Sequence, residues 1–143
     1  MELAVVLSLL VIIIPAVMNL YLSMERDLKK IVGKQHLQGE AAAWMTDFRD
    51  EVKSGRHFRL TEEGWLLFER SSGDTVRYSH DRRRLVRSVR RAGEKRFKGR
   101  TVMAHNVYIV TFATDREGVF VDIGLQNWHS DVSYQTYIRG RAP

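Results

Sequence analysis

The sequence has no cysteine and only two prolines, Pro15 and Pro143, among its 143 residues. Without cysteine the chain can form neither a disulfide framework nor a thiolate metal site, although this absence does not decide the compartment. Charge is also absent from Leu3 to Leu22, and no lysine or arginine occurs before Arg26. The first feature to explain is therefore an uncharged, strongly apolar run that opens the chain.

This run has the length of a membrane-spanning helix. Its twenty residues rise about 30 Å as an α-helix, which is the thickness of the hydrocarbon core of a bilayer. A cleaved signal peptide would need a basic region ahead of the apolar core and a small-x-small cleavage site. The chain has no such basic region, and Tyr21-Leu22-Ser23-Met24 is a poor cleavage site. We therefore expect residues 1–23 to form a retained transmembrane anchor.

The helix is expected to continue beyond the membrane as an amphipathic segment, residues 24–54. Apolar residues recur there at three- and four-residue spacings, as on one face of a helix: Met24, Leu28, Ile31, Val32, Ala41, Met45, Phe48 and Val52. Gly33 and Gly39 each weaken the helix by about 1 kcal/mol relative to alanine, which favours a bend there. Ser54-Gly55 is a stop signal, which predicts one long helix from Glu2 to Lys53.

The period changes to that of β-strands in residues 55–143, which we expect to form an antiparallel β domain. Short apolar or alternating runs separated by turn residues predict strands at residues 57–60, 65–69, 75–79, 85–89, 107–112, 119–125 and 132–138. A helix followed by a meander of strands indicates an α+β fold, in which the apolar stripe of the helix covers one face of the sheet.

This arrangement resembles the type IV pilins, and the soluble part is similar to the minor pilins of competence systems, the ComGF type, and to their type II secretion relative, the GspJ type. The residues that carry the resemblance span most of the chain: Glu2 to Leu10, Gly64 to Glu69, Gly73 to Tyr78, Arg84 to Val89, and Asn106 to Phe112. The family departs from this chain in one respect. It has a short basic leader that ends in glycine and is cut by a prepilin peptidase, whereas Met1 directly precedes Glu2 here, as an internal start codon would explain.

The resemblance implies that Glu2 and Pro15 serve assembly. In pilins the glutamate pairs with the freed N-terminal amine of a neighbouring subunit, and the proline kinks the spanning helix. The residues alone leave alternatives open, because Glu2 is also a favourable acid at a helix N-terminus, and prolines are tolerated in membrane helices. A basic leader would place the β domain outside the cell, whereas Arg26, Lys29 and Lys30 alone would place it in the cytoplasm by the positive-inside rule.

Positive charge is concentrated between Arg77 and Arg100. Eleven basic and two acidic residues give this segment a net charge of +9, against +6 for the whole chain. A possible polyanion-binding patch comprises Arg82, Arg83, Arg84, Arg87, Arg90 and Arg91. Phosphate binding is one interpretation. A solvated strand face, attraction to anionic lipid or wall polymer, and contact with an acidic partner subunit are the others.

No pattern in the sequence indicates an enzyme, a metal site or a cofactor. The five histidines are scattered, and neither a glycine-rich phosphate loop nor a nucleophile motif is present. Trp44, Trp65 and Trp128 are interpreted as core or interface residues. We therefore expect a minor pilin or pseudopilin of a competence pilus needed for DNA uptake. Its partners would be other minor pilins, the major pseudopilin and the membrane, with the β domain outside the cell and on the cell surface after assembly. The alternatives are a type II secretion-like minor pseudopilin, or a single-pass protein whose basic cytoplasmic domain binds nucleic acid or anionic lipid.

Overall fold

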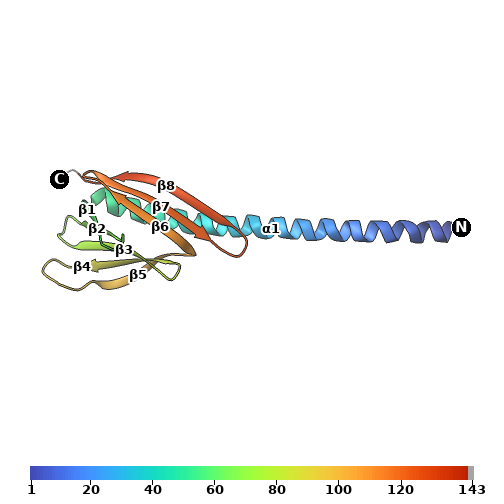
Figure 1. The fold of residues 1–143 in the computed structure, drawn as a ribbon, viewed down its shortest axis with the longest axis horizontal. Helices are drawn as coiled ribbons and strands as arrows, with labels where there is room; N and C mark the ends of the chain where they lie inside the picture. The colour runs from blue at the N-terminus through green and yellow to red at the C-terminus, as the bar shows by residue number, and fades with distance from the viewer. Residues whose placement is uncertain (142–143) are drawn as a thin grey trace.

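A computed structural model describes residues 1–141 as one long helix and a β domain built around the helix's C-terminal half (Figure 1). The helix α1 spans Glu2–Ser54. The strands that follow within these residues are β1 (Arg56–Leu60), β2 (Leu66–Glu69), β3 (Thr75–Asp81), β4 (Arg84–Arg90), β5 (Lys98–His105), β6 (Val107–Thr114), β7 (Gly118–Gln126) and β8 (Asp131–Arg139). The α+β fold and the long N-terminal helix that the sequence predicts are both confirmed.

The helix has two halves with different surroundings. It contains an 18-residue stretch that is apolar enough to cross a membrane, and no part of that stretch is buried in the protein. Farther along, residues at three- and four-residue spacings are buried against the strands: Gly33, Leu37, Ala41, Trp44, Phe48 and Val52. The helix continues through Pro15, Gly33 and Gly39 without interruption, and it is close to straight in Figure 1.

The covered stripe begins later than the sequence predicts. Met24, Leu28, Ile31 and Val32 are between 53% and 62% exposed. The strands reach along the helix only as far as the turn between β7 and β8, which contacts Lys30 and Gly33. Four apolar residues that were expected in the core therefore face outward.

The strands form two antiparallel sheets, where the sequence predicts a single meander. Sheet A has the order β1-β2-β3-β4-β5, and sheet B has the order β6-β7-β8. The strand β5 was not among the predicted strands. Most of its residues are exposed, because it lies at the edge of sheet A, so it lacks the apolar alternation by which the other strands are recognised.

One core joins the helix to both sheets. Phe48 stacks on Trp44 at 4.8 Å between ring centroids and meets Tyr78 of β3 edge to face at 4.9 Å. Its ring also lies 6.1 Å from that of Phe112 in β6. Each aromatic side chain of this kind buries roughly 150–250 Å². Phe48 therefore holds the helix against sheet A and sheet B at once.

The two sheets meet where β5 passes into β6. Asn106, which separates them, has a positive φ of 60°, a conformation that asparagine tolerates better than most residues. The backbone N–H of Val107 donates to the carbonyl of Arg83 at 3.0 Å, and the N–H of Gln126 donates to the carbonyl of Asn106 at 2.8 Å. Nε2 of His80 lies 2.7 Å from the carbonyl oxygen of Val107. These contacts tie the sheets together at the end of the domain nearer the N-terminal half of α1.

Candidate assembly surfaces

The exposed half of α1 is the largest unpartnered apolar surface in the described part of the chain. Its large side chains from Leu3 to Leu22 are 44% to 74% exposed, and continuous exposed apolar surfaces of this kind mark contacts with a membrane or another protein. Glu2 lies in the first helical turn, and Met1 provides no side-chain cap there. Pro15 lies in the middle of this half, and because proline has no N–H, the carbonyl four residues earlier lacks its helical donor.

The arginine-rich segment does not form one continuous patch. Arg82 and Arg83 lie in the turn between β3 and β4, and both have positive φ values, of 48° and 63°. Arg90 and Arg91 lie at the opposite end of β4, a seven-residue strand that spans about 20 Å. Figure 1 shows that the end of β4 next to β3 lies nearer the N-terminal half of α1, and that the end from which the chain continues toward β5 lies farther from it.

Arg87 points toward α1. Its Nε lies 2.9 Å from both carboxylate oxygens of Glu51, and the two side chains are only 19% and 15% exposed. The hydroxyl of Tyr78 donates to the same carboxylate at 3.1 Å. Burial, followed by the negative charge of Glu51, raises the pKa of Tyr78 well above its usual range. Arg87 therefore joins helix to sheet and is not available to a polyanion.

Other members of the predicted patch are also engaged within the domain. The guanidinium of Arg83 donates to the carbonyl of Gln126 at the junction between the sheets. Arg84 lies 3.6 Å from the carboxylate of Asp81, which also pairs with Arg100. These contacts neutralise part of the charge and fix the β3–β4 turn against its neighbours.

Arginine and aromatic side chains stack over the face of sheet A that is turned away from α1. The guanidinium of Arg77 lies 4.3 Å from the ring centre of Phe97 and 5.3 Å from that of Trp65, and Arg90 lies 5.1 Å from Phe97. Val86, which the strand register places on the same face of β4 as Arg90, is buried. Phe97 is thus occupied by two cations of its own chain and offers no free platform for a nucleic-acid base.

Within the segment from Arg77 to Arg100, the exposed basic side chains without an ion-pair partner divide between two places. Arg82 is at the β3–β4 turn, whereas Arg91, Lys95 and Arg96 all belong to the connection between β4 and β5. Within residues 1–141 no acidic side chain forms a salt bridge with these four. If the domain contacts a polyanion, the β4–β5 connection carries the denser free charge.

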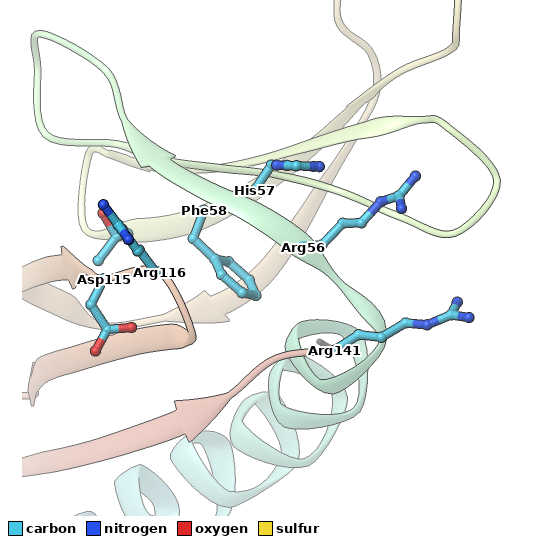
Figure 2. Close-up of a pocket in the computed structure, with 7 residues that line it drawn as sticks. Arg56, His57, Phe58, Asp115, Arg116 and Arg141 are labelled. Carbon is cyan, nitrogen blue, oxygen red and sulfur yellow. The ribbon is translucent and has the colours of Figure 1, made fainter. Parts of the chain in front are cut away.

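A basic cleft that the sequence did not suggest lies beside β1 and the C-terminal end, at the end of the domain far from the N-terminus (Figure 1), and Figure 2 shows it in close-up. It has a volume of about 490 Å³ and lies between β1, the β6–β7 turn and the chain after β8. Its lining residues are Arg56, His57, Phe58, Thr114, Asp115, Arg116 and Arg141. In Figure 2 the side chains of Arg56 and Arg141 extend in the same direction, away from the Phe58 ring. Residues from three distant segments form the cleft, so no local motif signals it.

Asp115, the acid in this cleft, is engaged by its own turn. Its Oδ1 accepts from the N–H groups of Glu117 and Gly118 at 2.8 and 2.7 Å, and the Tyr137 hydroxyl donates to both carboxylate oxygens at 3.0 Å. The two backbone hydrogen bonds hold the pKa of Asp115 below its usual range. The arginines of the cleft are therefore not paired with the one acid beside them, and their N–H groups can donate hydrogen bonds to a carboxylate or phosphate from outside.

Sheet B exposes apolar side chains on its outer face. Phe120 and Tyr137 lie directly opposite each other on β7 and β8 and are 41% and 47% exposed. Tyr108 and Ile109 of β6 are exposed to a similar degree, and both lie over Gly124, where a Cβ would come within 2.7–2.9 Å of them. Aromatic side chains of this kind are enriched in protein interfaces.

Comparison of the chain with protein-family models, curated proteins and solved structures finds no match. Within residues 1–141 the structure brings together no group of three or more histidine, aspartate or glutamate side chains that could hold a metal ion. The surfaces described above are therefore the basis for a functional proposal.

Proposed function

We propose that this chain is a minor pilin or pseudopilin of a competence pilus, a structural subunit needed for DNA uptake. One observation carries the proposal: an uncovered apolar helix half continues without a break into a half that is buried under two antiparallel sheets. The first half needs lipid before assembly and other apolar helices afterwards, because its exposed side chains have no cover within the subunit.

The proposed mechanism is assembly without catalysis. The apolar half of α1 packs among the helices of neighbouring subunits, and Glu2 neutralises the N-terminal amine of one of them. The apolar outer face of sheet B, with Phe120 and Tyr137, offers a surface to the domain of another minor pilin or the major pseudopilin. In this role the β domain lies outside the cytoplasm and reaches the cell surface in the assembled pilus.

Two other roles make different predictions. A type II secretion-like minor pseudopilin would use the same surfaces with a different set of partners. A single-pass protein with a cytoplasmic domain that binds nucleic acid or anionic lipid is favoured by the free charges of Arg91, Lys95 and Arg96. That role needs no contact between apolar helices.

The absence of cysteine allows a direct test. A single cysteine introduced as Lys95→Cys, at an exposed site, is treated in intact cells with a membrane-impermeant maleimide. Leu10→Cys in the apolar half is the matched control, which should stay unlabelled. We expect Lys95→Cys to be labelled from outside, and we expect the chain to be present in fibres sheared from competent cells. Labelling only after lysis, or absence from the sheared fibres, would contradict the proposal and favour the cytoplasmic alternative.

A further inference from the structure

The turn between β7 and β8 is held rigidly by its own hydrogen bonds. Oδ1 of Asn127 accepts from the N–H groups of His129 and Ser130 at 3.0 and 2.8 Å. The N–H of Asn127 donates in turn to the carbonyl of Ser130 at 2.9 Å. This pattern closes a tight turn around Trp128, so the position of that residue is fixed before anything binds.

The same turn is fastened to α1. Nδ2 of Asn127 donates to the carbonyl of Gly33 at 3.0 Å, and the hydroxyl of Ser130 donates to the carbonyl of Lys30 at 2.6 Å. Gly33 permits this close approach, because a Cβ there would lie 3.2 Å from the side chains of Asn127 and His129. The turn is therefore a fixed attachment of sheet B to the helix.

The turn presents Trp128 almost entirely to the surroundings. This side chain is 98% exposed, although it is the largest apolar side chain of the domain's surface. Next to the turn, Leu28 and Val32 of α1 are 59% and 62% exposed, and they line a groove of about 470 Å³ with Asn127 and His129. Burying a tryptophan of this kind is worth several kcal/mol. Trp128, Leu28 and Val32 therefore form an exposed apolar surface at the turn, of the kind that an occupant from outside the subunit covers.

The position of the turn along α1 indicates which occupant would cover Trp128. The uncharged part of the helix ends at Met24, and Lys30 lies six residues farther on, a rise of about 9 Å. The headgroup layer on each side of a bilayer is roughly 5–7 Å thick. Lys30 therefore lies about 2–4 Å beyond the headgroup layer, a distance shorter than a tryptophan side chain. Figure 1 shows that this turn extends farther along α1 toward the N-terminus than any other part of the β domain.

We propose that the β7–β8 turn, with Trp128 at its tip, rests in the lipid headgroup layer and seats the domain on the membrane surface while α1 is inserted. Tryptophan is typical of that layer, since its ring is apolar and its N–H needs a hydrogen-bond acceptor such as water or a headgroup oxygen. Arg26, Lys30 and Lys34 on the adjoining helix supply positive charge for lipid phosphates. The proposal rests on the part of the proposed function in which α1 spans a membrane, and it holds for either orientation of the domain.

The experiment measures tryptophan emission of the full chain in vesicles of phosphatidylcholine and phosphatidylglycerol, with or without bromine on the acyl chains close to the headgroup. Bromine quenches only tryptophans near it. Trp44 is buried in the core and Trp65 lies beneath Arg77. The difference between the natural chain and Trp128→Phe therefore reports on Trp128. A second protein, which combines Trp128→Phe with Tyr21→Trp, reports on insertion of α1.

We expect bromine to quench most of the Trp128 emission and to quench the tryptophan at position 21. Asn127→Ala, which removes the hydrogen bonds that hold the turn, should reduce the quenching of Trp128. Gln135→Ala on the exposed part of β8 is the matched control and should leave it unchanged.

Two results would overturn the proposal, and they differ in what else they affect. If position 21 is quenched but Trp128 is not, α1 spans the membrane and the turn stays in water or meets a second copy of the chain. The proposal then fails and the proposed function stands. If neither is quenched, membrane insertion fails, and the proposed function fails with it.

Discussion

Arg87 of β4 and Glu51 of α1 form a nearly enclosed ion pair, with Nε 2.9 Å from each carboxylate oxygen. The hydroxyl of Tyr78 donates to the same carboxylate, so side chains of three elements, α1, β3 and β4, meet at this one acid. Both charges lie within the domain, where solvent weakens their attraction less than at the surface.

Breaking this pair should destabilise the domain. We expect Glu51→Gln or Arg87→Met to lower the free energy of unfolding by about 2 kcal/mol, because either change leaves a charged partner poorly solvated. The double variant should lose less than the sum of the two, since the second change removes the stranded charge. Denaturant unfolding of the full chain in detergent measures this, with the exposed Arg91→Met as the control. Equal effects of Arg87→Met and Arg91→Met would show that the pair contributes nothing.

The two helix glycines should respond differently to alanine. Nothing lies within 4 Å of a Cβ added at Gly39, so Gly39→Ala should raise the free energy of unfolding by up to about 1 kcal/mol through helix propensity alone. At Gly33 the new Cβ would lie 3.2 Å from Asn127 and His129, and the gain should be reduced or reversed. The comparison is made by denaturant unfolding of both variants. A larger gain at Gly33 than at Gly39 would mean that the β7–β8 turn is not held against the helix.

Asp115 should contribute to the acid sensitivity of the fold. Its pKa is lower in the folded chain than its usual value, so the stabilisation is complete above the ordinary aspartate pKa of about 3.9 and is lost as the pH falls through the lower folded-state pKa. Asp115→Asn should therefore flatten the fall in unfolding midpoint below that pH. The exposed Asp131→Asn is the control, measured over the same pH range. An unchanged acid limb in Asp115→Asn would refute the assignment.

Glu2 should matter for assembly and not for insertion. Glu2→Ala removes the one acid at the head of the apolar half, so we expect the chain to remain in the membrane fraction but to be strongly depleted from sheared fibres. Glu2→Asp, which keeps the charge on a shorter side chain, should be affected less. Normal recovery of Glu2→Ala with the other subunits would contradict the assembly role.

The free charges of the β4–β5 connection should not be required for assembly. Reversing Arg91, Lys95 and Arg96 to glutamate changes exposed side chains with no salt bridge among the described residues. We therefore expect normal amounts in sheared fibres and unchanged transformation. Loss of transformation with normal assembly would instead identify this connection as a polyanion-binding surface. The difference in DNA affinity between the natural chain and the charge-reversed variant should then be largest at low salt.

Much of the architecture could be predicted from local pattern. The helix Glu2–Ser54 follows from apolar spacing and a single stop signal, and strands such as β6 and β7 follow from alternation. The strand β5 could not be found in this way, because an edge strand with its residues in solvent has no apolar face to detect. The division into two sheets depends on the β5–β6 junction and on pairings between distant segments, which local periodicity does not contain.

The arginines show where charge counting reaches its limit. A basic run was interpreted as one surface, but Leu85, Arg87 and Val89 alternate on the same side of β4, which was a sequence signal that Arg87 faces inward. The stacking of Arg77 and Arg90 on Phe97 has no such signal, because it joins β3 and β4 to the connection that precedes β5. The exposure of Trp128 likewise follows from how the β7–β8 turn meets α1.

The unbroken helix has a mechanical consequence. Each turn of an α-helix is bonded to the next, so rotation or translation applied at one end reaches the other. Phe48, the residue that holds both sheets, lies about 40 Å along the axis from Leu22. The position and rotation of the apolar half about the helix axis therefore also determine those of the β domain. They set the direction in which the Phe120–Tyr137 face points and its distance from the apolar half's surroundings.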